Sequence, residues 1–211
     1  SSSQVSQHAA ETAVKGFLED YYATSEAWSV KSSVQRVLKA TNSWLYAATR
    51  NGPYRYDIEK GYVCTFSAVV LKSATAHIFH AGDARVYRLQ GKGLEQLTED
   101  HRQWLSREKS YLSRALGMRE HMEIDYSTHA VEAGDTFILA TDGVYEFVEA
   151  QYVAEVIRQH SGNLDRAARL VVEEALARGS TDNLTIQIVR VDQIPHYTIE
   201  EMHHQAAALP F

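Results

Sequence analysis

Residues 136–143 read Thr136-Phe137-Ile138-Leu139-Ala140-Thr141-Asp142-Gly143, an apolar run that ends in a carboxylate and a glycine. The run is typical of a buried strand, and Asp-Gly is typical of the turn that follows one. Two other carboxylates lie in a similar context: Asp83 in the segment 81–85 and Asp182 in the segment 180–183. A short acidic side chain at the end of a strand is held rigidly at the edge of a sheet. The three segments therefore predict a sheet with acidic groups at its edge.

Short runs around this segment predict a meander of further strands. Apolar and polar residues alternate between positions 122 and 130, and the segments 72–74 and 91–93 are typical of hairpin loops. The predicted strands cover residues 63–71, 75–80, 85–89, 94–97, 122–130, 136–140 and 184–188. Because short loops join neighbouring strands, we expect the sheets to be antiparallel.

Helical spacing of apolar residues flanks these strands on both sides in the sequence. It predicts two long helices before them, at about residues 5–24 and 30–48, and helices at 153–157 and 164–177. The predicted fold class is α/β (α+β), an antiparallel β-sandwich flanked by helices. We expect residues 1–192 to form one domain and residues 193–211 to be a C-terminal linker or tail.

The composition of the chain excludes several function classes. The 211 residues carry 21 Lys+Arg against 27 Asp+Glu, a net charge of −6, which argues against nucleic-acid binding. The single Cys64 cannot form an intramolecular disulfide, and no apolar run is long enough to span a membrane. Without a signal peptide, the chain is expected to be cytoplasmic. Phosphate loops of the GxxxxGK type are absent, so nucleotide hydrolysis has no support.

Several carboxylates that converge at a sheet edge give the oxygen ligands that Mg²⁺ or Mn²⁺ prefers. Each of Asp83, Asp142 and Asp182 alone is also explained as an ordinary turn residue, and that alternative stays open for each. Cys64 is expected to be a buried packing residue. His77 and His80 point to opposite faces of a strand because of their odd spacing, so a structural role is expected for both.

Five segments resemble, in order, motifs of the metal-dependent Ser/Thr protein phosphatases of the type 2C (PPM) family, of the bacterial type. Gly82-Asp83-Ala84-Arg85 resembles the Gly-Asp-Ser-Arg motif of that family, and Ala140-Thr141-Asp142-Gly143-Val144 its Thr-Asp-Gly motif. The other three are Leu97-Thr98-Glu99-Asp100-His101, Leu112-Ser113-Arg114-Ala115-Leu116-Gly117 and Thr181-Asp182-Asn183-Leu184-Thr185. Each motif alone is weak, but five in family order within about residues 60–192 make chance similarity very unlikely.

The resemblance implies a metal-binding role for the three aspartates. It makes Asp142 and Asp182 ligands of one catalytic metal, and Asp83 with Asp142 a pair for a third, loosely held ion that many members bind. The implied reaction is hydrolysis of a phosphoserine or phosphothreonine ester on a protein. Two Mn²⁺ or Mg²⁺ ions would activate a bridging water, with no covalent phosphoenzyme. The resemblance further implies that Arg85 braces the Gly82 turn, and it suggests that His101 caps a loop.

One departure from the family concerns the start of the chain. The family begins with an Arg…Asn-Glu-Asp segment and an Asp-Gly strand end that bridges both metals, and neither precedes Ser1. We therefore expect this chain to be a fragment that binds metal weakly and is inactive in isolation. The parent protein is expected to be active.

The alternative function is a catalytically inactive pseudophosphatase that acts as a regulatory binding domain. The retained aspartates argue against it, because mutually repelling carboxylates need a cation to screen them. The end of the chain, Leu209-Pro210-Phe211, resembles the linker of bacterial fusions with a Ser/Thr kinase. A phosphoprotein substrate and a cognate Ser/Thr kinase are the expected partners.

Overall fold

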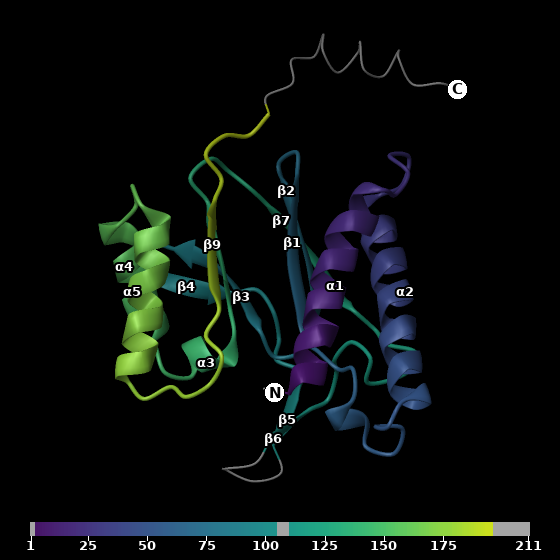
Figure 1. Cartoon of the computed structure of the whole chain (residues 1–211). Helices are drawn as coiled ribbons and strands as arrows, with labels where there is room; N and C mark the ends of the chain where they lie inside the picture. Colours follow the sequence, from purple (N-terminus) through teal and green to yellow (C-terminus); the bar gives the residue numbers. More distant parts are fainter. Residues whose placement is uncertain (1–2, 105–109, 196–211) are drawn as a thin grey trace.

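The computed structural model describes residues 3–104 and 110–195 and arranges them in four layers (Figure 1). Two long helices, α1 (Gln4–Tyr22) and α2 (Val30–Asn51), lie side by side on one side of the strands. Helices α4 (Ala150–Gln159) and α5 (Leu164–Ala177) lie on the other side. Two sheets lie between the helix pairs, so the prediction of a helix-flanked antiparallel β-sandwich is confirmed.

In the part of the chain that the structure describes, the strands form three antiparallel sheets. One has the order β1-β2-β7, the second β4-β3-β8-β9, and a two-stranded sheet pairs β5 with β6. The strands are β1 (Phe66–Lys72), β2 (Thr75–Ala81), β3 (Arg85–Gln90), β4 (Gly93–Gln96), β5 (Arg102–Trp104), β6 (Ser110–Leu112), β7 (Asp125–Ala130), β8 (Thr136–Ala140) and β9 (Ile186–Arg190). A 3-10 turn, η1 (Ile58–Lys60), precedes β1, and the short helix α3 (Asp142–Tyr145) follows β8. The chain crosses from the first large sheet to the second at residues 82–84, between β2 and β3.

Alternation of side chains along the strands builds three apolar clusters. On β8, Phe137 and Ile138 are both fully buried but belong to different clusters. Ile138 packs with residues of α4 and α5, whereas Phe137 packs with Ala76 of β2 between the two large sheets. Phe79 of β2 lies in the third cluster, with residues of α1 and α2. Each large sheet thus buries both faces, which places the ends of β2 and β8 on a rigid core.

Three strands begin later than the sequence predicts, and the last of them, β9, begins at Ile186 instead of residue 184. The run from residue 63 joins the sheet only at Phe66, because Cys64 makes an isolated bridge to Leu116 instead. Burial raises the pKa of the Cys64 thiol to about 12, in agreement with a packing role. The alternating run from residue 122 is a strand only from Asp125, which pairs with His80 near the end of β2. Before the run, the Asn42 side chain donates to the carbonyls of Arg119 and Glu120.

At the C-terminal end, the structure describes the chain as far as residue 195. The last strand, β9, ends at Arg190, and residues 196–211 lie outside the described residues, so the division at residue 192 stays a prediction. Within the described ranges, no helix combines the length and the apolar character that crossing a membrane requires.

Candidate functional site

The register of β3 and β8 brings Asp83 and Asp142 to the same edge of the sheet. Arg85 pairs with Ala140 in this antiparallel ladder. Asp83 lies two residues before Arg85 and Asp142 two residues after Ala140, so the two aspartates lie opposite each other just beyond the paired strands. The proximity that the sequence predicted from two strand ends is confirmed for this pair.

The guanidinium of Arg102 joins the two carboxylates. Its Nη2 donates to Asp83 Oδ2 at 2.6 Å and to Asp142 Oδ2 at 2.7 Å, and its Nε donates to Asp83 Oδ2 at 3.0 Å. Its Nη1 donates to Glu146 Oε1 at 2.5 Å. The side chain of Arg102 is only 14% exposed and that of Asp83 only 11%, so this pair is shielded from solvent. The Arg102 guanidinium therefore pairs with three carboxylates, with Asp83 and Asp142 through one nitrogen and with Glu146 through another.

Burial and charge act in opposite directions on Asp83. Burial raises the pKa of its carboxyl group above the usual value, the Arg102 guanidinium opposes that rise, and the neighbouring Asp142 charge adds to it. The net result is a raised pKa, which marks Asp83 as a carboxylate whose charge needs a nearby cation.

The turn that carries Asp83 is fixed from two sides. Gly82 has a φ of +131°, and its N–H donates to His101 Nδ1 at 3.0 Å while its carbonyl accepts from the His101 N–H at 2.7 Å. On the other side, the Tyr145 hydroxyl donates to the carbonyl oxygen of Asp83 at 2.8 Å. The expected loop-capping role of His101 is confirmed. Arg85, which was expected to brace this turn, instead pairs with Asp100 at 2.8 Å and lies over the Tyr145 ring.

The hydrogen bonds of His101 define its tautomer. Because Nδ1 accepts from the Gly82 N–H, the proton of the neutral ring lies on Nε2, which donates to Asp125 Oδ2 at 2.9 Å. Asp125 also pairs with Arg114. Burial acts to raise the pKa of Asp125, but the hydrogen bond from His101 and the Arg114 charge outweigh it and hold that pKa below the usual value. This chain of contacts ties the Asp83 turn to β7.

Asp182 lies on the loop beside Asp142 and does not share in the Arg102 contacts described above. The Thr141 N–H donates to the Thr185 carbonyl at 3.1 Å, and a Cβ added to Gly143 would lie 2.6 Å from the Asn183 carbonyl. These contacts place the 182–185 loop against the start of α3, while the Asp182 side chain itself is exposed. In the parts of the chain that the structure describes, no three His, Cys, Asp or Glu side chains gather closely enough to form a metal site.

The Asp83–Asp142 pair nonetheless fits a divalent cation. Oxygen atoms from two carboxylates already share one positively charged nitrogen, so the pair is arranged to bind a cation. Carboxylate oxygens are the donors that Mg²⁺ and Mn²⁺ prefer. Asp182 would have to turn toward Asp142 to complete the predicted three-aspartate set.

Sequence reasoning missed Arg102. It directly follows the segment 97–101 and has no motif of its own. Its position depends on the pairing of β5 with β6, where Arg102 lies opposite Leu112, and on the chain crossing near residues 82–84. The available hint was that Arg102 is a basic residue directly after the segment 97–101, while the candidate aspartates need a positively charged partner.

The two strand histidines have structural partners, as predicted. His77 Nδ1 lies 2.9 Å from the Tyr126 hydroxyl. His80 Nε2 lies 3.0 Å from the Glu99 carbonyl, which can only accept, so this nitrogen carries the proton and Nδ1 accepts from the Ser67 hydroxyl at 2.9 Å.

Acidification should lower stability through His80. Burial, and then the neighbouring His101, lower the pKa of His80 below its usual value. The unfolded chain therefore takes up a proton at this position from about pH 6.5 downward, before the folded protein does, so the stabilisation present above that pH is lost as the pH falls. We expect the urea midpoint to be lower at pH 5.5 than at pH 7.5, and His80→Gln to reduce the difference. The control is His8→Gln on the exposed face of α1, which should preserve the difference; an equal decline in the His80 variant would contradict the assignment.

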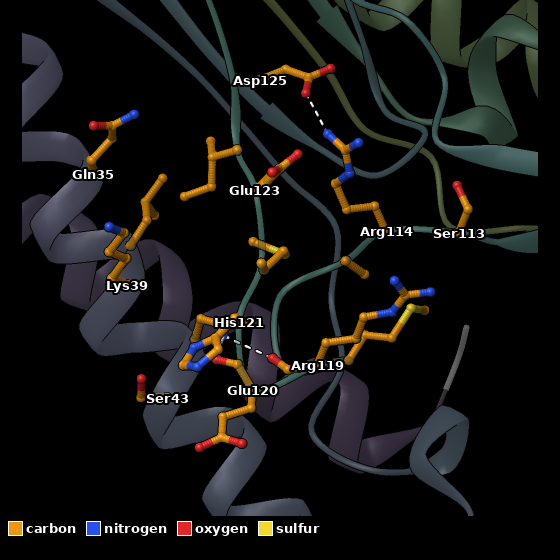
Figure 2. Close-up of a pocket in the computed structure, with 16 residues that line it drawn as sticks. Gln35, Lys39, Ser43, Ser113, Arg114, Arg119, Glu120, His121, Glu123 and Asp125 are labelled. Atoms are coloured by element: carbon orange, nitrogen blue, oxygen red, sulfur yellow. Dashed lines mark hydrogen bonds and ion pairs between the residues drawn. The ribbon is translucent and has the colours of Figure 1, made fainter.

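A large hollow lies away from the aspartates (Figure 2). It has a volume of about 970 Å³ and lies between α2 and residues 113–125. Figure 2 shows Gln35, Lys39 and Ser43 on the helix side, with Arg114 directed at Asp125 on the opposite side. None of the three candidate aspartates lines it, but two of its lining residues contact His101: Asp125 through His101 Nε2, and Ser113, whose N–H donates to the His101 carbonyl at 2.8 Å.

Comparison with known proteins places the chain among protein phosphatases. The family model described as "Protein phosphatase 2C" matches residues 1–178. The "Serine/threonine phosphatase stp" of Listeria monocytogenes is 29% identical over 147 residues, which cover 63% of this chain and 58% of that protein. The chain thus spans about three fifths of the length of such curated relatives.

Two solved structures share the fold. The Mycobacterium tuberculosis serine/threonine phosphatase PstP/Ppp superimposes with a TM-score of 0.74 at 20% identity, covering 89% of this chain and 82% of that one. The catalytic domain of PstP "in complex with 2 Manganese ions" gives a TM-score of 0.71 at 21% identity, with coverages of 86% and 79%. At these identities, the likeness establishes the fold alone.

Proposed function

Because the chain belongs to the protein phosphatase 2C family, we propose that it supplies the catalytic domain for metal-dependent hydrolysis of phosphoserine and phosphothreonine on proteins. The observation that supports the proposal most strongly is the convergence of Asp83 and Asp142 on one cationic group at the edge of the sheet. The related phosphatase of Listeria is longer than the matched region, so substrate and activity of the whole protein are part of the proposal.

The proposed ligands are the three aspartates. Asp142 and Asp182 would hold one catalytic ion, and Asp83 with Asp142 would hold a further, weaker one. Bound Mn²⁺ or Mg²⁺ would supply a water with a lowered pKa and neutralise the phosphoryl oxygens. The presence of two manganese ions in the PstP complex favours the same class of ion here.

The chain's own residues would hold these ligands in place. His101 and Tyr145 fix the backbone around Asp83 through three hydrogen bonds, so its carboxylate needs little reorganisation to bind a cation. Asp142 is fixed by its position as the first residue of α3, directly after β8. Both ligands thus lie just beyond the ends of two paired strands, β3 and β8, of the same packed sheet.

The wider role follows from the family. We propose a phosphoprotein substrate, a cognate Ser/Thr kinase as partner and a cytoplasmic signalling role. Residues 1–192 would form the phosphatase domain, with residues 193–211 as the linker beyond it. Since this chain offers three acidic ligands, of which the structure brings two together, it should bind metal weakly and turn over little by itself.

The test is an assay of the full-length gene product on phosphopeptides. We expect Mn²⁺ to be required for release of phosphate from phosphoserine and phosphothreonine peptides, and EDTA in excess to abolish it. A matched phosphotyrosine peptide should be a poor substrate. The 211-residue chain, assayed in parallel, should be much slower.

Two results would change the proposal. Rapid Mn²⁺-dependent turnover by the 211-residue chain would contradict the expectation that it is weak in isolation. Absence of turnover under every condition, from a folded full-length protein that still binds phosphopeptides, would favour the regulatory binding domain instead.

A further inference from the structure

Arg102 occupies the position between the two carboxylates that are proposed to bind metal. Its Nη2 lies 2.6 Å from one oxygen of Asp83 and 2.7 Å from one oxygen of Asp142. Asp83 Oδ2 also accepts from Nε of the same guanidinium. The carboxylate oxygens that face each other across the site are therefore already engaged by a positive charge.

We infer that Arg102 is a built-in counter-cation of the Asp83–Asp142 pair, which competes with a divalent metal ion for these carboxylates. The inference rests on the proposed function, because it assumes that the pair binds metal. It adds that metal must displace Arg102, so that the protein's affinity for the ion is set partly by an arginine.

The electrostatics of the site support this exchange. Two carboxylates that both lie within 2.7 Å of one nitrogen are close enough to repel each other strongly in a shielded site. One cation between them removes the repulsion. A guanidinium remains charged at every pH at which the protein is folded, so it balances the pair in the absence of metal. A divalent ion would need the same oxygen atoms, and the two cations cannot occupy the space together.

Glu146 provides a third contact for Arg102, which remains when a metal ion replaces Arg102 at the two aspartates. It caps the end of α3, and its Oε1 accepts from Arg102 Nη1 at 2.5 Å, away from the two aspartates. The Glu146 side chain is 44% exposed, against 11% for Asp83. An arginine released from the aspartates would keep this partner at the rim of the site and could return when the metal leaves.

The test is the affinity of the folded 211-residue chain for Mn²⁺, measured by calorimetry with MnCl₂ alone. Arg102→Gln removes the charge and keeps a polar side chain. We expect it to bind Mn²⁺ at least about tenfold more tightly, which corresponds to about 1.4 kcal/mol. In the absence of metal its thermal midpoint should fall, because Asp83 and Asp142 then repel each other, and Mn²⁺ should raise that midpoint more than in the original protein.

Two further variants separate this role from a purely structural one. Arg88→Gln breaks a comparably buried ion pair, Arg88 with Asp135, outside the candidate site; it should lower the thermal midpoint and leave Mn²⁺ affinity unchanged. Arg102→Lys keeps the charge but cannot present the same fork of donors, so an intermediate affinity is expected. The lysine variant also carries the test if the glutamine variant does not fold.

Adding Asp83→Asn to the Arg102 variant identifies the carboxylate involved. If Arg102 competes at the Asp83–Asp142 pair, the double variant should lose the gain in affinity. Unchanged or weaker Mn²⁺ binding by folded Arg102→Gln would overturn the inference. That result would leave the proposed function intact, provided that Mn²⁺ still binds and the full-length protein still needs it for turnover.

Discussion

Asp142→Asn in the full-length protein is expected to lower Mn²⁺-dependent hydrolysis of a phosphoserine peptide by roughly a hundredfold or more. Asp142 is the one aspartate assigned to both proposed ions, and it lies on the sheet edge opposite Asp83. The amide keeps the size of the side chain but removes the charge that binds a cation. The measurement is the initial rate against Mn²⁺ concentration.

A control variant separates loss of the site from loss of the fold. Asp192→Asn changes an exposed carboxylate that pairs with Arg190 at the end of β9 and is not one of the proposed ligands. Its rate should stay within about twofold of the original, since surface substitutions of this kind cost at most a few tenths of a kcal/mol. Wild-type turnover by folded Asp142→Asn would remove Asp142 from the proposed mechanism.

The second large effect is expected from Gly82→Ala. Gly82 has a φ of +131°, a conformation that L residues rarely adopt, and an added Cβ would lie 2.4 Å from the Thr65 side chain. Backbone strain and overpacking together should lower the free energy of unfolding by about 3 kcal/mol or more. The change should be measured by urea unfolding, with Mn²⁺ affinity as a second readout, because the turn carries Asp83.

Two other glycines provide a graded comparison. Gly134 also has a positive φ, of +96°, but an added Cβ would meet no atom within 4 Å, so Gly134→Ala should cost only the strain, about 1–2 kcal/mol. Gly16 lies within α1 with open space around it, so Gly16→Ala should be neutral or stabilising by up to about 1 kcal/mol. Equal effects at Gly82 and Gly134 would show that contact with Thr65 contributes nothing.

The layers and the Asp83–Asp142 pair could be predicted from sequence because their signals are local. The run 136–140 is a strand with the bounds that its apolar residues indicate, and the helix 164–177 is confirmed residue for residue. Once two strands of one antiparallel sheet are known, the carboxylates just beyond their ends are expected to meet. The metal-binding role of Asp83, Asp142 and Asp182 remains a prediction.

The parts that escaped prediction depend on contacts between distant segments. Arg102 reaches Asp142 across 40 positions of sequence, and nothing in its neighbours indicates that contact. Cys64 leaves the predicted strand because Leu116 pairs with it. Likewise, Arg85 forms an ion pair with Asp100 and does not brace the Gly82 turn. In each case the partner of the side chain or strand residue is set by the packing of distant segments and not by a local sequence pattern.

The most direct test of the central claim, that Asp83 and Asp142 bind a divalent cation, is a crystal structure of the 211-residue chain at high MnCl₂ concentration. An anomalous difference map should contain a manganese peak in contact with both carboxylates, with the Arg102 guanidinium moved away from them toward Glu146. A well-defined map with no peak at these carboxylates, and with Arg102 still between them, would contradict the claim.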